Sequence, residues 1–336
     1  MTSTVETTTR PVVALTPGDP AGIGPEIVLK AVMDPRVRAA CRPLAVADAP
    51  LMRWWAKRLG LPVAVRDVAL PADAAFANGM VDVVQAGDFA LDGFAPAAMR
   101  AENGRAILDW AGRAVELALA GEVAAIVAAP QTQKAIEIAG IPFDGYPGFI
   151  ASRTGTPADD VFLMLANDQR RIVHVTLHVG LRRALELIDQ PRVVRALTAA
   201  DAALRNLGVA RPRLAVSGVN PHAGEGGLFG REEIDIVAPA IAAAQAAGID
   251  ADGPFGADTM YLKDGYDGFV VMIHDQGHIP AKLTGFDRTA AFTIGTPVFF
   301  SSVAHGSAYD IAGRGVADPS ALIATLLAMS RVRSGA

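Results

Sequence analysis

The six histidines of this chain, all in its second half, are the residues whose positions point most directly to chemistry. They stand at 174, 178, 222, 274, 278 and 305, each at the end of an apolar run or in the glycine-containing segment after one. Imidazole nitrogens are preferred ligands of borderline divalent cations, so histidines at neighbouring strand ends indicate a metal site with an open position for substrate. The single cysteine, Cys41, can form neither an internal disulfide nor a thiolate site, so any ligands would be histidines or carboxylates.

Three histidines at three strand ends could share a metal ion: either His174 or the better-placed His178, together with His222 and His274. In RIVHVTLHVG, His174 and His178 lie on one face of an expected strand, with His178 nearer its end. His222 lies in the glycine-rich turn of SGVNPHAGEGG, and an apolar strand is expected to deliver His274 into a loop that carries Asp275 and Gln276. Each also has an ordinary structural interpretation: a satisfied core histidine, a turn residue bonded to its own loop, or a cap for carbonyls at a strand end.

Two glycine-rich segments and one lysine complete the candidate chemistry. TPGDPAGIGPE has neither the Lys-Ser/Thr pair of a P-loop nor a GxGxxG pattern, so we interpret it as a tight strand-to-helix turn, with phosphate binding as the alternative. In HGSAYDIAGRG, small side chains would let an adenosine lie against backbone, and Asp310 could accept hydrogen bonds from ribose hydroxyls. Lys282, in a largely apolar setting, could transfer a proton or hold an anionic substrate; an exposed surface lysine is the alternative.

The elements that must position these residues alternate between strands and helices. Strands are expected at 12–16, 123–129, 213–217 and 268–274, and helices at 27–32, 105–120, 192–207, 232–247 and 319–331. Because the strands are apolar without alternation, they should be buried on both faces of a parallel or mixed sheet flanked by helices. The predicted class is α/β, and such sheets bind ligands at the carboxyl ends of their strands.

Composition excludes several other classes of protein. Of 336 residues, 51% are apolar and 19% charged, which is typical of a globular chain rather than a disordered one. The net charge of −5, without a basic cluster, argues against nucleic acid as a partner. The polar, threonine-rich start resembles no export signal, and no stretch has the apolar length of a membrane span, so we expect a cytoplasmic protein with no membrane partner.

Several motifs in fixed order resemble one enzyme family. PGDPAGIGPE, NPHAGEGG, ADT, HDQG with a lysine eight residues after its histidine, and HGSAYDIAGRG are similar to the 4-hydroxythreonine-4-phosphate dehydrogenase family. The first and last also look like segments of isocitrate and isopropylmalate dehydrogenases. The resemblance implies a two-domain subunit with a cleft: residues 1–133 with 291–336 would form the first domain, and residues 134–290 the second, with the metal, substrate and dimerisation residues. It further implies a homodimer with the active site at the subunit interface.

The resemblance also assigns cofactors and residues. It implies a divalent metal, with zinc favoured, on His178, His222 and His274, and NAD or NADP on a loop without a Rossmann fingerprint. Lys282 would contact substrate or relay a proton, and Asp258 or Asp275 would orient a ligand imidazole. The cofactor-binding residues would be His305, Gly306, Ser307, Ala308, Asp310, Ile311 and Ala312.

The departures from the family concern the substrate. Where the phosphate-substrate enzymes carry a His-Thr pair, this chain has Tyr146-Pro147, and where they carry an Asn and an Arg it has Ala291 and Phe300. Losing a bidentate arginine clamp is not a conservative change for phosphate recognition. FDGYP, VFLML, RIVHVTLH and HDQGHIP look instead like terephthalate cis-dihydrodiol dehydrogenases.

That branch implies a dicarboxylate diol as the substrate. The reaction would be oxidation of 1,2-dihydroxy-3,5-cyclohexadiene-1,4-dicarboxylate to protocatechuate with loss of carbon dioxide. Tyr146, Phe300 and Lys282 would line the substrate site, with Phe292 as a further candidate.

Two alternatives stay open at this point. A dehydrogenase of a phosphorylated hydroxy acid would need a new phosphate clamp, for which Arg153 or Arg288 are candidates. A non-catalytic metal or small-acid binding protein would show no cofactor-dependent activity. Asp310 favours NAD over NADP.

Overall fold

One mixed sheet runs through the described part of the chain. The structure is a computed structural model that describes residues 10–285, 289–303 and 305–332. Within these residues, 12 strands lie in the order β3-β4-β2-β1-β5-β12-β11-β6-β7-β10-β8-β9. Their bounds are β1 (Val12–Thr16), β2 (Arg42–Ala47), β3 (Ala64–Val68), β4 (Met80–Gln85), β5 (Ala125–Ala128), β6 (Phe162–Ala166), β7 (Arg171–His174), β8 (Arg213–Ser217), β9 (Asp250–Phe255), β10 (Gly268–Val271), β11 (Ala290–Ile294) and β12 (Phe300–Val303).

Two parallel blocks of this sheet meet through antiparallel strands. β11 runs antiparallel to both β12 and β6, and β6 is antiparallel to β7. The strands on either side pair in parallel, for example β1 with β5 and β10 with β8. β5 and β10 are buried along their whole lengths, as expected for strands covered on both faces. The predicted α/β class, with a mixed sheet, is confirmed.

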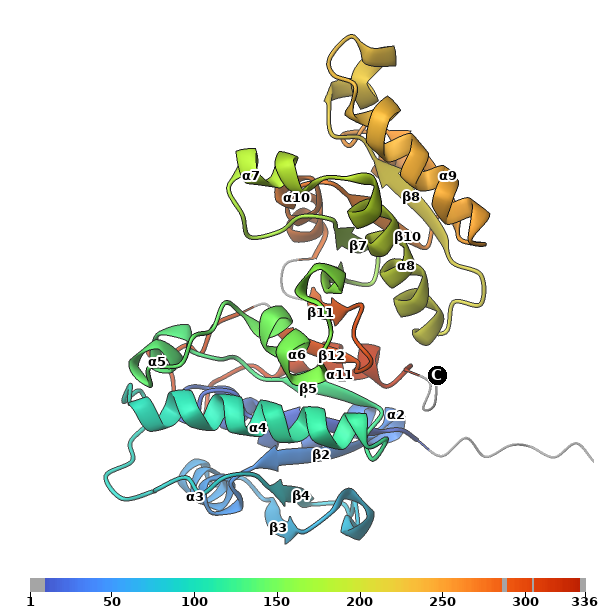
Figure 1. The fold of residues 1–336 in the computed structure, drawn as a ribbon. Coiled ribbons are helices and arrows are strands. Elements are labelled where there is room, and N and C mark those ends of the chain that lie inside the picture. The colour runs from blue at the N-terminus through green and yellow to red at the C-terminus, as the bar shows by residue number, and fades with distance from the viewer. Residues whose placement is uncertain (1–9, 286–288, 304, 333–336) are drawn as a thin grey trace, which may run out of the picture.

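Helices cover both parallel blocks, as Figure 1 shows, and β11 and β12 lie between the two groups of helices. Their bounds are α1 (Gly24–Met33), α2 (Pro35–Ala40), α3 (Ala49–Leu59), α4 (Ala101–Leu119), α5 (Gln133–Ile138), α6 (Tyr146–Thr154), α7 (Leu181–Leu187), α8 (Gln190–Asn206), α9 (Ala238–Ala246), α10 (His274–Gly285) and α11 (Ser320–Met329). No helix of the described residues is long and apolar enough to cross a membrane.

Most predicted elements are present, and two strands, β7 and β10, end three or four residues earlier than predicted. β1 and β8 have the predicted bounds, whereas the helix expected at 232–247 begins with a π-helical turn, Glu233–Val237. β7 ends at His174, where its pairing with β6 ends, so His178 lies in the following loop and not on the strand. β10 ends at Val271, and HDQGH begins α10 instead of forming a loop.

The side chain of Gln276 accounts for this change from strand to helix. Its Oε1 accepts hydrogen bonds from the backbone N–H groups of Met272 (3.0 Å) and Ile273 (3.1 Å), directly after β10. Gln276 Oε1 is thus an acceptor for both donors as the chain leaves the sheet, and the Met272 N–H has a second acceptor in the Ser217 hydroxyl (3.3 Å). His274 is thereby placed at the start of α10.

The two glycine-rich segments, which are nearly 300 residues apart, pack against each other. Ile23 N–H donates to the Ser307 carbonyl (2.9 Å), and Tyr309 Oη donates to Oδ2 of the buried Asp19 (2.6 Å). Gly18, at φ +64°, has no room for a Cβ because the Pro130 carbonyl occupies that space. The interpretation of TPGDPAGIGPE as a tight turn is confirmed.

The division into two domains remains a prediction, but the packing of α5 and α6 bears on its boundary. Gly104 of α4 lies directly beneath the backbone of α5, where any Cβ would meet the Ala135 carbonyl. In α6, Arg153 donates to Glu116 of α4 (2.9 Å). Both helices, predicted to belong to the second domain, therefore pack against a helix of the first.

Removing the Tyr309 hydroxyl should destabilise the protein. Tyr309→Phe deprives a buried carboxylate of a donor, and we expect the free energy of unfolding to fall by about 1–3 kcal/mol in urea denaturation. Tyr266→Phe is the matched control, because its hydroxyl also donates to a carboxylate, Asp252, but one that solvent reaches. Equal losses in the two variants would contradict the importance of the buried contact.

Candidate metal centre

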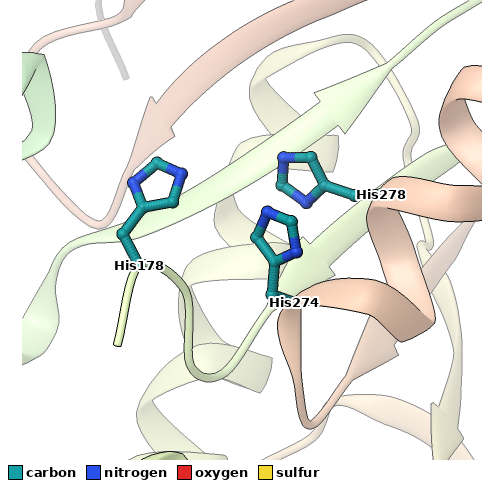
Figure 2. Close-up of side chains that lie close together, drawn as sticks. All are labelled: His178, His274 and His278. Atoms are coloured by element: carbon teal, nitrogen blue, oxygen red, sulfur yellow. The ribbon is translucent and has the colours of Figure 1, made fainter. Parts of the chain in front are cut away.

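Four histidines from two segments gather where β7 and β10 end. His174 is the last residue of β7, His178 follows in the loop, and His274 and His278 lie one turn apart on α10. One nitrogen from each of His178, His274 and His278 lies within 4.8 Å of the other two. Figure 2 shows these three rings around one common space.

Helix spacing and sheet register produce this arrangement. Residues four apart share a helix face, so the His274 and His278 rings stack with centroids 3.8 Å apart. Val271 of β10 pairs with His174 of β7, which places His174 beneath the first turns of α10. Gly277 makes that approach possible, because any Cβ there would collide with His174 Nε2.

Hydrogen bonds orient three of the rings. His174 Nδ1 lies 3.3 Å from the Leu163 carbonyl, and His174 Nε2 lies 3.1 Å from His278 Nδ1. His274 Nδ1 lies 2.7 Å from Asp275 Oδ1. A carboxylate that holds the far nitrogen of a metal-binding imidazole is a common outer contact in metal sites.

The electrostatics of the cluster favour neutral imidazoles. Burial, reinforced by the neighbouring histidines, lowers the pKa of His174 to about 3 and that of His278 to about 4. Burial and His274 also lower the pKa of His178. Neutral imidazoles carry the lone pairs that a metal ion binds, so this donor set fits a borderline divalent cation.

Of the three ligands that the resemblance implies, the structure brings together two. His178 and His274 share the cluster, but His222 does not belong to it within the described chain. His222 is exposed, at φ +52°, in the turn Pro221–Gly227. The cluster member that we had not assigned is His278, and its four-residue spacing from His274 is the signal that a helical HDQGH would have provided.

The three predicted charged residues lie in different surroundings. Asp275 contacts His274. Asp258 lies near His222, because both border the space next to Gly256: a Cβ on that glycine would be 2.8 Å from Asp258 Oδ1 and 3.8 Å from His222 Cα. Lys282 is exposed on α10, one turn beyond His278, so the apolar setting predicted for it is wrong. Its four-residue spacing from His278 still keeps it on the histidine face of the helix.

The predicted substrate aromatics are buried. Tyr146 and Phe300 are 6% and 1% exposed, and their ring centroids lie 4.7 Å apart. The Tyr146 hydroxyl is buried without a hydrogen-bond partner in the described residues, and burial, with the nearby Asp19 charge, raises its pKa. Phe292 is also buried, beside a separate cavity of about 500 Å³.

The predicted cofactor loop joins the turn of the first glycine-rich segment. Ser307 is buried and accepts a hydrogen bond from Thr132 (2.8 Å), which fixes the middle of the loop. Gly306 and Asp310 are exposed, and the remaining residues, His305, Ala308, Ile311 and Ala312, are half-buried. The Asp310 carboxylate is thus accessible to a ligand.

The two arginines considered as phosphate clamps give no clamp in the described structure. Arg153 forms an ion pair with Glu116 of α4 (2.9 Å). Arg288 lies outside the described residues.

Comparisons with known proteins identify the class of enzyme. Residues 39–328 match the family described as "Pyridoxal phosphate biosynthetic protein PdxA". The 4-hydroxythreonine-4-phosphate dehydrogenase of Desulforapulum autotrophicum is 38% identical over 324 residues, 95% of each chain. The 1,2-dihydroxy-3,5-cyclohexadiene-1,4-dicarboxylate dehydrogenase of a Comamonas species is 42% identical over 315 residues, 93% of this chain and 95% of that protein.

Solved structures agree with this assignment. The 4-hydroxythreonine-4-phosphate dehydrogenase of Klebsiella pneumoniae has a TM-score of 0.88 at 38% identity, covering 96% of this chain and 100% of that one. The terephthalate 1,2-cis-dihydrodiol dehydrogenase of Burkholderia xenovorans has a TM-score of 0.75 at 42% identity, covering 95% and 98%. The fold and the histidine cluster thus define a metal-dependent dehydrogenase that oxidises a CH–OH group with NAD or NADP. The chain belongs to the PdxA family.

The buried His174 should make the metal-free protein sensitive to acid. Its pKa is lowered in the folded state, so below the unfolded value of about 6.5 the unfolded chain binds one more proton and folding weakens as the pH falls. Between pH 6.5 and pH 5, His174→Gln should therefore lose about 2 kcal/mol less unfolding free energy than the wild type. Urea denaturation in the presence of a chelator measures the unfolding free energy of both proteins. If the two free energies changed with pH in parallel, the prediction would be contradicted.

Proposed function

We propose that this protein oxidises terephthalate cis-dihydrodiol to protocatechuate and carbon dioxide, with NAD or NADP and a divalent metal ion, zinc being favoured. The observation that carries the proposal is the contact between Tyr146 and Phe300. At positions where the phosphate-substrate enzymes carry a histidine and an arginine, the chain has two packed aromatic rings, whose one polar group is the Tyr146 hydroxyl, and such rings suit a flat cyclohexadiene. The Comamonas and Burkholderia relatives are named for this type of substrate.

A second candidate is a dehydrogenase of a phosphorylated hydroxy acid. It is favoured by the likeness to the Klebsiella structure and by the D-threonate 4-phosphate dehydrogenase of Cupriavidus necator, which is 38% identical over 320 residues, 94% of this chain and 95% of that protein. It requires a phosphate clamp, and Arg153 is already engaged by Glu116. We therefore rank it second.

His178 and His274 would hold the metal ion, together with His222 of the partner subunit in a homodimer. Such sharing would reconcile His222 with its position outside the cluster of its own chain. When bound, the ion supplies Lewis-acid polarisation of the hydroxyl to be oxidised and of the neighbouring oxygen. Asp275 would hold the His274 ring, and Asp258 would play the same part beside His222.

The remaining residues would bind and orient the two reactants. A hydride leaves the carbon that bears the oxidised hydroxyl for the nicotinamide, and the hydroxyl proton is released. The bond to the adjacent carboxylate then breaks, its electron pair enters the ring, and protonation of the ring oxygen gives the aromatic catechol. Lys282 would contact a substrate carboxylate, and Asp310 would accept hydrogen bonds from the cofactor ribose.

Substrate specificity can be tested directly. We expect the metal-loaded protein to form reduced nicotinamide with the cis-dihydrodiol and not with 4-phosphohydroxythreonine or D-threonate 4-phosphate. Initial rates at 340 nm with the three substrates in parallel measure this, and metal-free protein is the control. Turnover of a phosphate ester alone would show that the Tyr146–Phe300 interpretation is wrong.

A shared site can be tested by mixing two inactive variants. His222→Gln and His274→Gln should each lose metal and activity, because each removes one imidazole from every site. If the subunits share sites, unfolding and refolding the two variants together should restore about one quarter of wild-type activity, since half of the dimers then carry one intact site. Each variant refolded alone is the control, and no recovery on mixing would contradict the shared site.

A further inference from the structure

His278 has no part in the proposed ligand set, although it faces the same space as His178 and His274. One ring nitrogen of His278 lies within 4.8 Å of a nitrogen of each of these two, and its ring stacks on His274. Behind it stands His174, a fully buried histidine to which the proposed reaction assigns no role. The hydrogen bonds of these two rings define what His278 can do.

The directions of the two hydrogen bonds, from His278 to His174 and from His174 to Leu163, follow from the carbonyl at the end of this hydrogen-bonded chain. The Leu163 carbonyl can only accept, so His174 Nδ1 must carry the proton that bonds to it. A neutral imidazole has one N–H, so His174 Nε2 is an acceptor, and His278 Nδ1 donates to it across 3.1 Å. His278 Nε2 is therefore left with a free lone pair, and its Nδ1 is already occupied.

The packing around His174 holds these two hydrogen bonds in place. His174 is 1% exposed, and burial lowers its pKa to about 3, which keeps the ring neutral. Gly277 leaves space for Nε2 where any side chain would block it. The pairing of β7 with β6, which ends at Leu163 and His174, sets the ring beside its carbonyl acceptor.

We propose that His174 is a positioning residue that fixes the tautomer of His278, and that His278 Nε2 accepts a hydrogen bond from the second hydroxyl of a vicinal diol. This second hydroxyl is the one next to the hydroxyl that is oxidised. The inference rests on the proposed function for the diol as natural substrate. A hydroxyl group in an enclosed site binds well only where an acceptor receives its hydrogen, and the lone pair of His278 is such an acceptor.

The tautomer can be measured without any substrate. In ¹⁵N-histidine NMR spectra of the metal-free protein, we expect His174 and His278 both to be protonated at Nδ1 and unprotonated at Nε2. His174→Leu removes the Nε2 acceptor and leaves the backbone of His274, so it should give His278 a larger fraction of the Nε2–H tautomer, whereas His174→Gln, whose amide oxygen can accept, should preserve the Nδ1–H form. A wild-type His278 protonated at Nε2 would overturn the proposal.

Selectivity for the second hydroxyl can be measured by binding, also without turnover. 3,4-Dihydroxybenzoate and 3-hydroxybenzoate differ by the hydroxyl assigned to His278, so the ratio of their dissociation constants reports its contribution. We expect His278→Leu to reduce the preference for the dihydroxy compound about tenfold in calorimetric titrations. Any contact of that hydroxyl with the metal is present in both the wild type and His278→Leu, so it cancels when their two ratios are compared.

Metal content separates this role from that of a ligand. His278→Leu should retain wild-type metal content by elemental analysis; loss of the metal would overturn the proposal and make His278 a ligand. An unchanged preference for 3,4-dihydroxybenzoate would overturn it too. If the wild type fails to oxidise the diol while the tautomer and binding results hold, the proposed function fails and the role of His278 stands.

Discussion

The site depends on one side-chain amide, that of Gln276, which joins the ends of two parallel strands to the start of a helix. Its Oε1 accepts the N–H groups of Met272 and Ile273 after β10, and its Nε2 donates to the Gly218 carbonyl after β8 (3.0 Å). These contacts supply hydrogen-bond partners to three backbone polar groups where the chain leaves the sheet. Because α10 begins here, the half-buried His274 and His278 lie beside the end of β7.

The crowding of four imidazoles is costly for a protonated cluster and favourable for a neutral one. Burial lowers the pKa of His174, His178 and His278, and the neighbouring histidines add to the effect. The neutral imidazoles therefore present their nitrogen lone pairs to one common space, where a divalent cation can bind them and protonation is disfavoured. The contacts that orient the rings come from different places: a backbone carbonyl for His174 and the Asp275 carboxylate for His274.

Substrate choice in this family is not decided by the fold. Relatives named for phosphorylated hydroxy acids and for a dicarboxylate diol resemble this chain at 38% and 42% identity. Function on a shared fold is determined by a few side chains at the site. In the proposed function those side chains are Tyr146 and Phe300, whose buried rings pack together and whose one hydroxyl has no hydrogen-bond partner among the described residues.

Apolar periodicity and motif order can be recognised in the amino-acid sequence alone, and they were enough to predict the α/β class, the family, the bounds of β1 and β8, and the grouping of His178 with His274. It did not determine where β7 ends, that HDQGH is helical, or that Tyr146 and Phe300 are buried. Those features depend on partners far away in the chain: β6 stops pairing at His174, and Gln276 bonds to the ends of both β8 and β10. The same dependence on distant partners explains why His278 belongs to the cluster within one chain and His222 does not. Only the tertiary structure sets the register of β7 against β10, which decides which imidazoles of one chain meet.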